Sequence, residues 1–389
     1  MEYDFDTPLS RAGTCAEKYT ALERLFGRAD LLPFWVADME FATSPAVVRV
    51  LKERAAHPVY GYTSMPASLP AAVTAWNRKR YGLEVGEDAV IFVPGVMVGV
   101  AAALQEFTEP GDGVVVQPPL YPPLMETVRR NRRNLIENPL IVHSGRYEMD
   151  FEGLERIMRH NRPRMLLLCA PHNPVGRVWN REEMARLVSL VQEHDVCLVS
   201  DEIHADLVYP PYKQVSPLSL DRETPCRTIV LNAASKSFNV PGLCTAYALI
   251  PDPTLHAAFR RRLRRLNLSG VNLFGMLALD AAYREGEEWL GELLPYLQAN
   301  RDRINQVLER DFPGMARFVP EGTTLYWLDF SSLGFKDEEV ERRLREVARV
   351  ALNDGRSFGE NGGGFRRFNF AVPRSMLEEG LVRILRAFG

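Results

Sequence analysis

The stretch TIVLNAASKSFN (Thr228–Asn239) decides how the fold is interpreted. Its first four residues are typical of a short strand buried on both faces, and Lys236 follows just beyond the end of that strand. Two other strand-like runs end in a similar way, since VCLVS precedes Asp201 and MLLLCA leads to Asn173. In open α/β sheets, ligands bind outside the carboxyl ends of the strands. The three side chains therefore indicate one ligand site at the edge of a sheet.

From about residue 89 onward, short apolar runs alternate with helical stretches. Alternation of this kind favours an α/β domain with a mostly parallel sheet. Ser44 and Pro45 suit the N-cap and the first position of an earlier helix. We expect strands at 90–93, 114–117, 135–142, 165–170, 196–200, 228–231 and 245–250, and helices at 151–160 and 181–194.

The pattern changes after about residue 285, and this change predicts a second, smaller α+β domain. The expected division is an N-terminal segment, 1–44, that contributes to the small domain, a large domain, 45–285, and a small domain, 286–389. Within the small domain we expect a helix at 289–310, a strand at 324–330, a charged helix at 337–352, a glycine-rich loop at 355–364, a strand near 368–371 and a closing helix after Pro373.

Composition excludes several classes of protein. The 389 residues carry a net charge of −3 and are 46% hydrophobic, so the chain can bury a large core. A nucleic-acid binder is usually basic, and the basic clusters at 129–133 and 260–265 are expected to be solvated faces or ion-pair partners. The best apolar run, 95–104, is too short to span a membrane. The acidic N-terminus is not expected to be a signal peptide.

Other common site motifs are missing from the sequence. The five cysteines are scattered, and we expect buried, reduced thiols in a cytoplasmic protein. The seven histidines lack metal-binding spacing, and neither G-x-G-x-x-G after a strand nor G-x-x-x-x-G-K-[ST] occurs. If Asp201 and Lys236 are considered alone, a structural ion pair remains an alternative to a ligand site, and Asp201 could also cap a helix.

Three motifs, in this order and spacing, carry a family resemblance: Pro171–Gly176 (PHNPVG), Ser200–His204 (SDEIH) and Ser235–Asn239 (SKSFN). They resemble the pyridoxal-phosphate enzymes of the aspartate-aminotransferase fold (fold type I), and the similarity runs over nearly the whole chain. Within that fold the sequence looks most like the cystathionine β-lyase group of carbon–sulfur lyases, the MalY/PatB type. The stretches that carry the finer resemblance are Phe5–Arg11, Leu31–Phe41, Tyr60–Tyr62, Gln117–Tyr121 and Phe370–Ser375.

The resemblance implies an aspartate-aminotransferase-like α/β fold with a seven-stranded sheet, and pyridoxal 5′-phosphate as the cofactor. Lys236 would hold the cofactor as a Schiff base and then take the substrate α-proton. Asp201 would face the pyridine nitrogen and keep the ring protonated. Asn173, with a cis peptide bond after it, and His204 would contact the 3-hydroxyl, and Tyr121 would stack on the ring. A structural histidine and a packed loop aromatic remain alternatives for the last two.

The phosphate group requires hydrogen-bond donors. A helix is expected to open after Gly95, so the backbone N–H groups of Val96 and Met97 point at an anion, and Ser235 offers a hydroxyl. An apolar helix start without a ligand is the alternative. The resemblance also implies that Tyr62 reaches the phosphate of a neighbouring subunit, in a homodimer with shared sites.

The substrate side is expected to involve Arg367, which would grip the α-carboxylate with both arms of its guanidinium, and Ala37. Arg366 is adjacent, and neighbouring side chains of a strand point to opposite faces, so only one of the two can enter the site. The family pattern of the following residues favours Arg367. A surface role for both arginines remains the alternative.

Three departures from the wider family bear on the function. Many aminotransferases of this fold carry an arginine about eight residues after the lysine, whereas 242–245 has none, which fits the lyase group. Ala233 stands where some relatives have a phosphate-binding serine. Asn353 and Asp354 precede Gly355 where Pro-Gly is more usual, and this bears on the substrate entrance.

The sequence therefore predicts a pyridoxal-phosphate-dependent β-lyase that acts on sulfur amino acids and releases a thiol, pyruvate and ammonia. No metal, nucleic acid or membrane is expected as a partner. Residues alone do not separate elimination from transamination, because both pass through the same carbanion. An aminotransferase is one alternative, and a regulatory protein that binds a partner and keeps the cofactor as a structural ligand is another.

Overall fold

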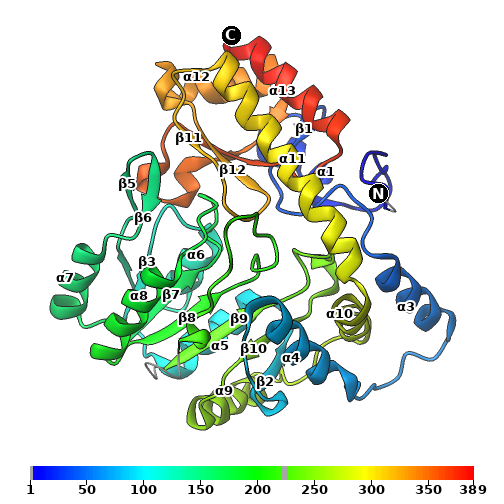
Figure 1. Cartoon of the computed structure of the whole chain (residues 1–389), viewed down its shortest axis with the longest axis vertical. Coiled ribbons are helices and arrows are strands. Elements are labelled where there is room, and N and C mark those ends of the chain that lie inside the picture. Colours follow the sequence, from blue (N-terminus) through cyan, green and yellow to red (C-terminus); the bar gives the residue numbers. More distant parts are fainter. Residues whose placement is uncertain (1–2, 221–226) are drawn as a thin grey trace.

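A twisted sheet forms the centre of the larger part of the molecule (Figure 1). The computed structural model describes residues 3–220 and 227–389. In these residues, seven strands pair in the order β2-β10-β9-β8-β7-β3-β4, and only β10 runs antiparallel to its neighbours. The expected mostly parallel sheet is confirmed. Its strands are β2 (Val90–Val93), β10 (Ala246–Leu249), β9 (Thr228–Asn232), β8 (Cys197–Asp201), β7 (Met165–Cys169), β3 (Gly113–Val116) and β4 (Asn134–Glu137).

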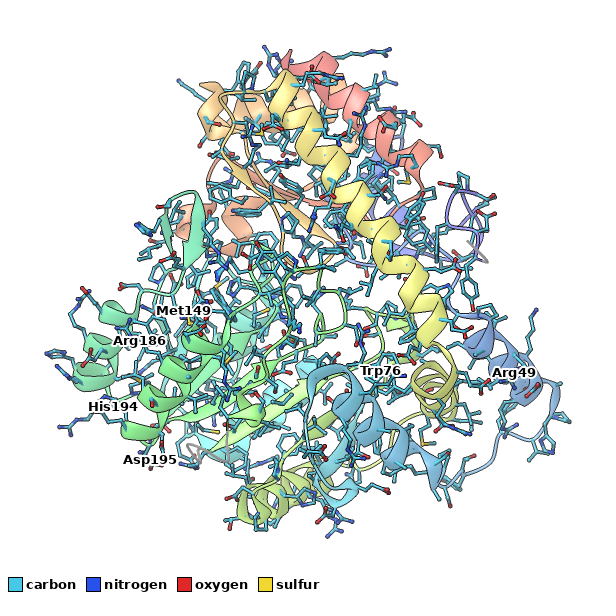
Figure 2. The ribbon with its side chains drawn as sticks, viewed as in Figure 1. Arg49, Trp76, Met149, Arg186, His194 and Asp195 are labelled. Carbon is cyan, nitrogen blue, oxygen red and sulfur yellow. The ribbon has the colours of Figure 1, made fainter. Side chains whose placement is uncertain are left out.

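Helices cover both faces of this sheet, which explains why its central strands are largely apolar. In β7, Leu167 packs into the cluster on one face, whereas Leu166 and Leu168 pack into the cluster on the other. Figure 2 shows His194 and Asp195, just after α8, at the outer edge of the molecule. The covering helices are α5 (Val96–Phe107), α6 (Pro122–Arg130) and α9 (Pro253–Arg265) on the first face, and α7 (Phe151–Asn161) and α8 (Arg181–Glu193) on the second.

A group of helices packs beside the β2 end of the sheet: α3 (Pro45–Ala56), α4 (Ser68–Tyr81) and α10 (Leu273–Glu285). Trp76, labelled in Figure 2, stacks on Tyr283 with ring centroids 4.8 Å apart. Ser44 is at the N-cap of α3 as predicted, but its side chain makes no capping hydrogen bond. The connection from α3 to α4, residues 57–67, runs over the surface as an extended loop (Figure 1).

The smaller part contains an antiparallel sheet in the order β11-β12-β15-β14, crossed by the long helix α11 (Figure 1). The charged helix predicted to reach residue 352 ends at Ala348, because Arg349 adopts a left-handed conformation (φ 54°) and a strand follows. The elements are α11 (Glu287–Asp311), β11 (Arg317–Phe318), β12 (Leu325–Asp329), α12 (Asp337–Arg342), a π-helical turn η5 (Arg343–Ala348), β13 (Val350–Ala351), β14 (Asn353–Asp354), β15 (Phe365–Asn369) and α13 (Arg374–Phe388).

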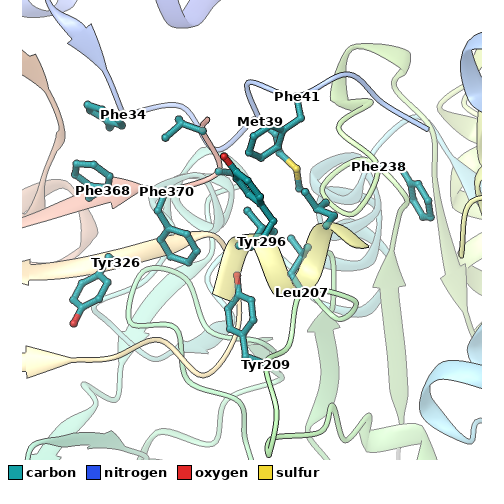
Figure 3. Packing of buried hydrophobic residues seen from close by; sticks show 14 of the residues in the cluster. Phe34, Met39, Phe41, Leu207, Tyr209, Phe238, Tyr296, Tyr326, Phe368 and Phe370 are labelled. Carbon is teal, nitrogen blue, oxygen red and sulfur yellow. The ribbon is translucent and has the colours of Figure 1, made fainter. Parts of the chain in front are cut away.

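The N-terminal segment packs on this smaller part. It contains α1 (Glu17–Thr20), α2 (Leu22–Phe26) and β1 (Leu32–Pro33), and β1 pairs in parallel with β13. The ring of Phe34 stacks on Phe368 at 4.3 Å, within the aromatic cluster of Figure 3 that also holds Tyr326 and Phe370. These contacts support the domain division predicted above, which we keep as a proposal.

Several expectations need correction. The strand expected at 135–142 is split into β4 and β5 (Ile141–His143), and β5 forms a separate hairpin with β6 (Arg146–Glu148). Cys169 and Cys197 are buried as expected. Cys15, in a turn, and Cys244, just after the short helix η3 (Pro241–Leu243), are exposed, and Cys226 lies outside the described residues.

The basic clusters at 129–133 and 260–265 match in part the expectation of solvated faces or ion-pair partners. Arg261 and Arg262 both pair with Glu106, whereas Arg133 is buried and donates to the carbonyls of residues 104 and 108. None of the helices within residues 3–220 and 227–389 combines the length and the apolar composition that a membrane span requires.

Candidate active site

A cavity of about 510 Å³ opens at the carboxyl ends of the parallel strands. It is also lined by residues of the N-terminal segment and of β14, β15 and the loop between them. Ten of the eleven predicted site residues line it: Ala37, Val96, Met97, Tyr121, Asn173, Asp201, His204, Ser235, Lys236 and Arg367. The eleventh, Tyr62, is fully exposed on the loop between α3 and α4, so its predicted role in a neighbouring subunit remains a prediction.

Lys236 lies in the turn that follows β9. Its Nζ donates a hydrogen bond of 2.7 Å to the backbone oxygen of Ala37. Burial and the positive charge of Arg367 lower the pKa of Lys236 to about 8, although Asp38 and Asp201 act in the opposite direction. The side chain is therefore a partly buried amine that loses its proton close to neutral pH, as a nucleophile or proton acceptor requires.

Asp201 is the last residue of β8, and its Oδ1 accepts a hydrogen bond of 3.1 Å from the backbone N–H of Ile203. Burial raises the pKa of Asp201 to about 6, so a cationic ligand group beside it would favour the charged carboxylate. The helix-cap alternative is not supported, because a turn follows β8. Within the described residues, the recorded hydrogen bond of Lys236 Nζ goes to the backbone oxygen of Ala37 and not to Asp201.

Asn173 and His204 lie on two adjacent loops of the cavity wall. A cis peptide bond follows Asn173 as predicted, and the N–H of Tyr121 donates to the backbone oxygen of Asn173 at 3.0 Å. Burial and the charges of Lys236 and Arg367 lower the pKa of His204 to about 3, so its imidazole is neutral. Its buried Nδ1 has no hydrogen-bond partner among the described residues, which leaves a ring nitrogen for a ligand to satisfy.

The start of α5 supplies a place for an anion. Val96 and Met97 are its first residues, and the preceding Gly95 has no side chain that could cap them. The first N–H groups of a helix lack partners within the helix and attract negative charge. Ser235 lines the same cavity, and Ala233 lines it too, which fits the predicted loss of one hydroxyl.

Arg367 enters the cavity from β15 and has well-defined partners. Its Nη1 donates to Oδ1 of Asn173 at 3.0 Å, and its Nη2 donates to the backbone oxygen of Trp35 at 2.9 Å and to Oδ1 of Asn353 at 2.7 Å. Burial lowers the pKa of Arg367 to about 10. Arg366 points to the opposite face of the sheet and pairs with Asp337, so of these two adjacent arginines it is Arg367 that lines the cavity.

Some cavity residues had no role predicted from the sequence. The ring of Phe358 lies 5.0 Å from the guanidinium of Arg367, and Cys169 accepts a hydrogen bond from the N–H of Asn173 at 3.4 Å. Burial raises the pKa of the Cys169 thiol, which stays neutral. Asn353 stood out in the sequence only as a departure from Pro-Gly. An aromatic residue or a thiol in an apolar or glycine-rich stretch is indistinguishable from ordinary packing, so the sequence held no signal for Phe358 and Cys169.

A family model described as aminotransferase class I and II matches residues 29–384. The chain belongs to this family, the pyridoxal-phosphate enzymes of fold type I, and its predicted aspartate-aminotransferase-like fold is confirmed. Cystathionine beta-lyase PatB of Bacillus subtilis (strain 168) is 39% identical, with 99% of each chain covered. The similarity to the carbon–sulfur lyase group that the sequence predicted is therefore confirmed.

Two solved structures agree with this placement. A pyridoxal-phosphate-bound protein of Clostridium difficile 630, provisionally described as an aminotransferase, has a TM-score of 0.97 and 37% identity over 100% of both chains. Cystalysin of Treponema denticola, whose structure contains pyridoxal 5′-phosphate, has a TM-score of 0.94 and 32% identity over 100% of this chain and 99% of that one.

Proposed function

We propose that this chain is a pyridoxal-phosphate-dependent carbon–sulfur β-lyase that cleaves the Cβ–S bond of cystathionine, cysteine or a related S-conjugate to give a thiol, pyruvate and ammonia. The observation that carries the proposal is the meeting of Lys236, Asp201 and Arg367 in one cavity. An amine, a carboxylate and a fixed guanidinium are the groups that an amino-acid substrate and a pyridine cofactor require.

The cavity fits the cofactor. The unpartnered Nδ1 of His204 suits a ring hydroxyl, the buried carboxylate of Asp201 suits a ring nitrogen, and the open start of α5 suits a phosphate. Ser235 would add a hydroxyl at the phosphate, and Tyr121 would cover the ring. When bound, the protonated ring supplies a sink for the negative charge that develops at the substrate Cα.

The protein side chains then have separate tasks. Lys236 would hold the cofactor covalently through Nζ and, once released, would take the proton from the substrate Cα, which its pKa of about 8 permits near neutral pH. Arg367 would bind the α-carboxylate, with Ala37 beside it. Asp201 would keep the ring nitrogen protonated. The cytoplasmic location predicted from the sequence belongs to the same proposal.

We also propose a homodimer in which Tyr62 binds the phosphate in the neighbouring subunit. Support comes from the loop between α3 and α4, where Val59, Tyr60, Tyr62 and Met65 all expose large apolar side chains. Apolar residues gathered on one exposed loop are typical of an interaction surface. A two-fold axis would then give two shared sites.

The test is product formation by purified holoenzyme. Cystathionine should yield homocysteine and pyruvate, and cysteine should yield hydrogen sulfide and pyruvate, both at rates that do not depend on an added 2-oxo acid. Amino transfer to a 2-oxo acid without pyruvate from either substrate would establish the aminotransferase alternative. The absence of both reactions, with the cofactor bound, would favour the regulatory alternative.

A further inference from the structure

Arg366 and Arg367 are adjacent in β15 but have opposite electrostatic surroundings. Arg366 is completely buried against carboxylates, with Asp337 at 2.9 Å and Asp354 at 3.5 Å. Arg367 has no ion pair within the described part of the chain, and its three recorded hydrogen-bond acceptors are all neutral oxygens. Neutral acceptors orient a guanidinium without cancelling its charge. The positive charge of Arg367 therefore remains available to an anionic ligand in the cavity.

Asn353 makes the shortest of these three bonds, 2.7 Å from its Oδ1 to Nη2 of Arg367. The register of β14 against β15 pairs Asn353 with Arg367 and Asp354 with Arg366. Because side chains alternate along a strand, the first pair lies on the cavity face and the second on the opposite face. Asn353 itself lines the cavity. A two-residue strand thus supplies an amide to one arginine and a carboxylate to the other.

We propose that Asn353 is a positioning residue for substrate recognition. It fixes Arg367 for the α-carboxylate of an amino acid and, because its side chain is a neutral amide, it leaves the charge of Arg367 unpaired. This rests on the proposed function, in which Arg367 binds that carboxylate. Asn353 accepts a hydrogen bond from Nη2 of the guanidinium, and Asn173 accepts one from Nη1. The remaining donors include Nε, which is buried and has no partner among the described residues. The substrate carboxylate would therefore meet the guanidinium of Arg367 in a fixed orientation and with hydrogen-bond donors still unused.

The test compares two small ligands on the holoenzyme, glycine and methylamine, which differ by the carboxylate. Affinity is measured from the change in visible absorbance of the bound cofactor. Asn353→Ala should weaken glycine about tenfold, since a charge-assisted hydrogen bond is lost. Asn353→Asp should weaken glycine about a hundredfold, because its carboxylate pairs with Arg367 and competes with the ligand. Methylamine should bind both variants within about twofold of the wild type.

The matched control is Asp354→Asn, one residue along the same strand on the opposite face. It should lower the melting temperature, because buried Arg366 loses a carboxylate, and leave the affinity for glycine unchanged. Asn353→Asp has nearly the same shape as the wild type, so it carries the test if Asn353→Ala fails to fold.

Two results overturn the inference. One is glycine affinity within about twofold of the wild type in the Asn353 variants, and the other is an equal loss for methylamine. Arg367→Lys distinguishes failure of the positioning role of Asn353 from failure of the proposed carboxylate site at Arg367. If that variant loses glycine binding while the Asn353 variants do not, only the positioning role is wrong. If Arg367→Lys binds glycine normally, the carboxylate site of the proposed function is wrong, and the positioning role with it.

Discussion

The hydroxyl of Ser237 donates a hydrogen bond of 2.7 Å to Oδ2 of Asp206. Ser237 directly follows Lys236, and Asp206 lies in the turn after β8, so this bond joins two loops that line the cavity. The other oxygen, Oδ1, accepts hydrogen bonds from Trp76 and Tyr81. A buried carboxylate outside the cavity therefore sets the position of the lysine loop.

Ser237→Ala should destabilise the protein by about 1–3 kcal/mol, because Oδ2 of Asp206 is buried and loses the one donor recorded for it in the described residues. The measurement is urea unfolding. Ser219→Ala is the control, since its hydroxyl donates to a neutral carbonyl at a partly exposed site and should cost less. Equal losses in the two variants would contradict a special role for the Asp206 contact.

The pKa of about 8 for Lys236 predicts how covalent capture of the cofactor depends on pH. Only the neutral amine attacks the aldehyde, so the capture rate of the cofactor-free protein should rise about tenfold per pH unit below pH 8 and level off above it. Stopped-flow absorbance measures this rate. A rise that continues to about pH 10 would show an ordinary lysine.

Two further variants and one label sharpen this test. Arg367→Gln should move the profile to higher pH, because the charge of Arg367 contributes to the lowered pKa of Lys236. After borohydride reduction, the cofactor should be found on Lys236 by mass spectrometry, and an adduct on Lys213 would contradict the assignment. Lys236→Ala should abolish turnover.

Arg367→Lys should lower kcat/KM by roughly thirty- to a thousandfold, because an ammonium cannot reproduce the planar fork that binds a carboxylate. Arg366→Lys should instead lower the free energy of unfolding by about 1–3 kcal/mol, with KM nearly unchanged, since Arg366 is buried among Asp337, Glu341 and Asp354. Kinetics and urea unfolding of both variants check this. The reverse ranking would move the carboxylate site to Arg366.

Lys236→Ala and Tyr62→Ala subunits, each inactive alone, should regain activity when mixed. If Tyr62 serves the neighbouring subunit, each mixed dimer contains one site with both native residues. The measurement is pyruvate release after subunit exchange, with the mixed dimer verified by mass. No recovery in a verified mixed dimer would show that Tyr62 does not act across subunits.

Glu202 predicts a pH-dependent stability. Burial raises its pKa to about 7, although the hydroxyls of Ser200 and Ser216 both donate to it. The folded state therefore keeps a proton that the unfolded state has lost, so the contribution of this group is full below about pH 4.5 and disappears as the pH rises through 7.

Glu202→Gln removes this titration. As the pH rises from 5 to 8, the free energy of unfolding of the variant minus that of the wild type should increase by about 1–3 kcal/mol. Urea unfolding at both pH values measures the difference. In the cofactor-free protein, on which this test is made, Asp201 also has a raised pKa and remains in the variant, so part of the wild-type slope should persist. An unchanged slope would mean that Glu202 is already charged in the folded protein.

The central strands could be predicted because burial on both faces leaves a continuous apolar run, as in β7 and β8. Two failures have physical causes. The run at 135–142 divides because its two ends have different partners: β4 pairs with β3 up to Glu137, whereas β5 pairs with β6. The charged helix ends early because β13 pairs with β1, a contact between distant segments that no local pattern indicates.

The site could be predicted where one short motif carries the chemistry, as for Lys236, Asp201 and Asn173. The role of Asn353 could not, because it depends on the register of β14 against β15 across the glycine-rich loop 355–364. The cation contact of Phe358 depends on the same loop. Tyr62 lies outside the cavity of its own chain, so only its resemblance to the family gives it a function.

The hydrogen bond from Arg367 to the backbone oxygen of Trp35 joins two residues that are 332 positions apart. On a ribosome, the sheet that bears Lys236 is complete long before β15 leaves the exit tunnel. During that interval β1 has no β13 to pair with, and the segment around Trp35 lacks the side chains that hold it. The order of synthesis therefore means that the side of the cavity that carries Lys236 can form first, and the side that carries Arg367 can form only at the end.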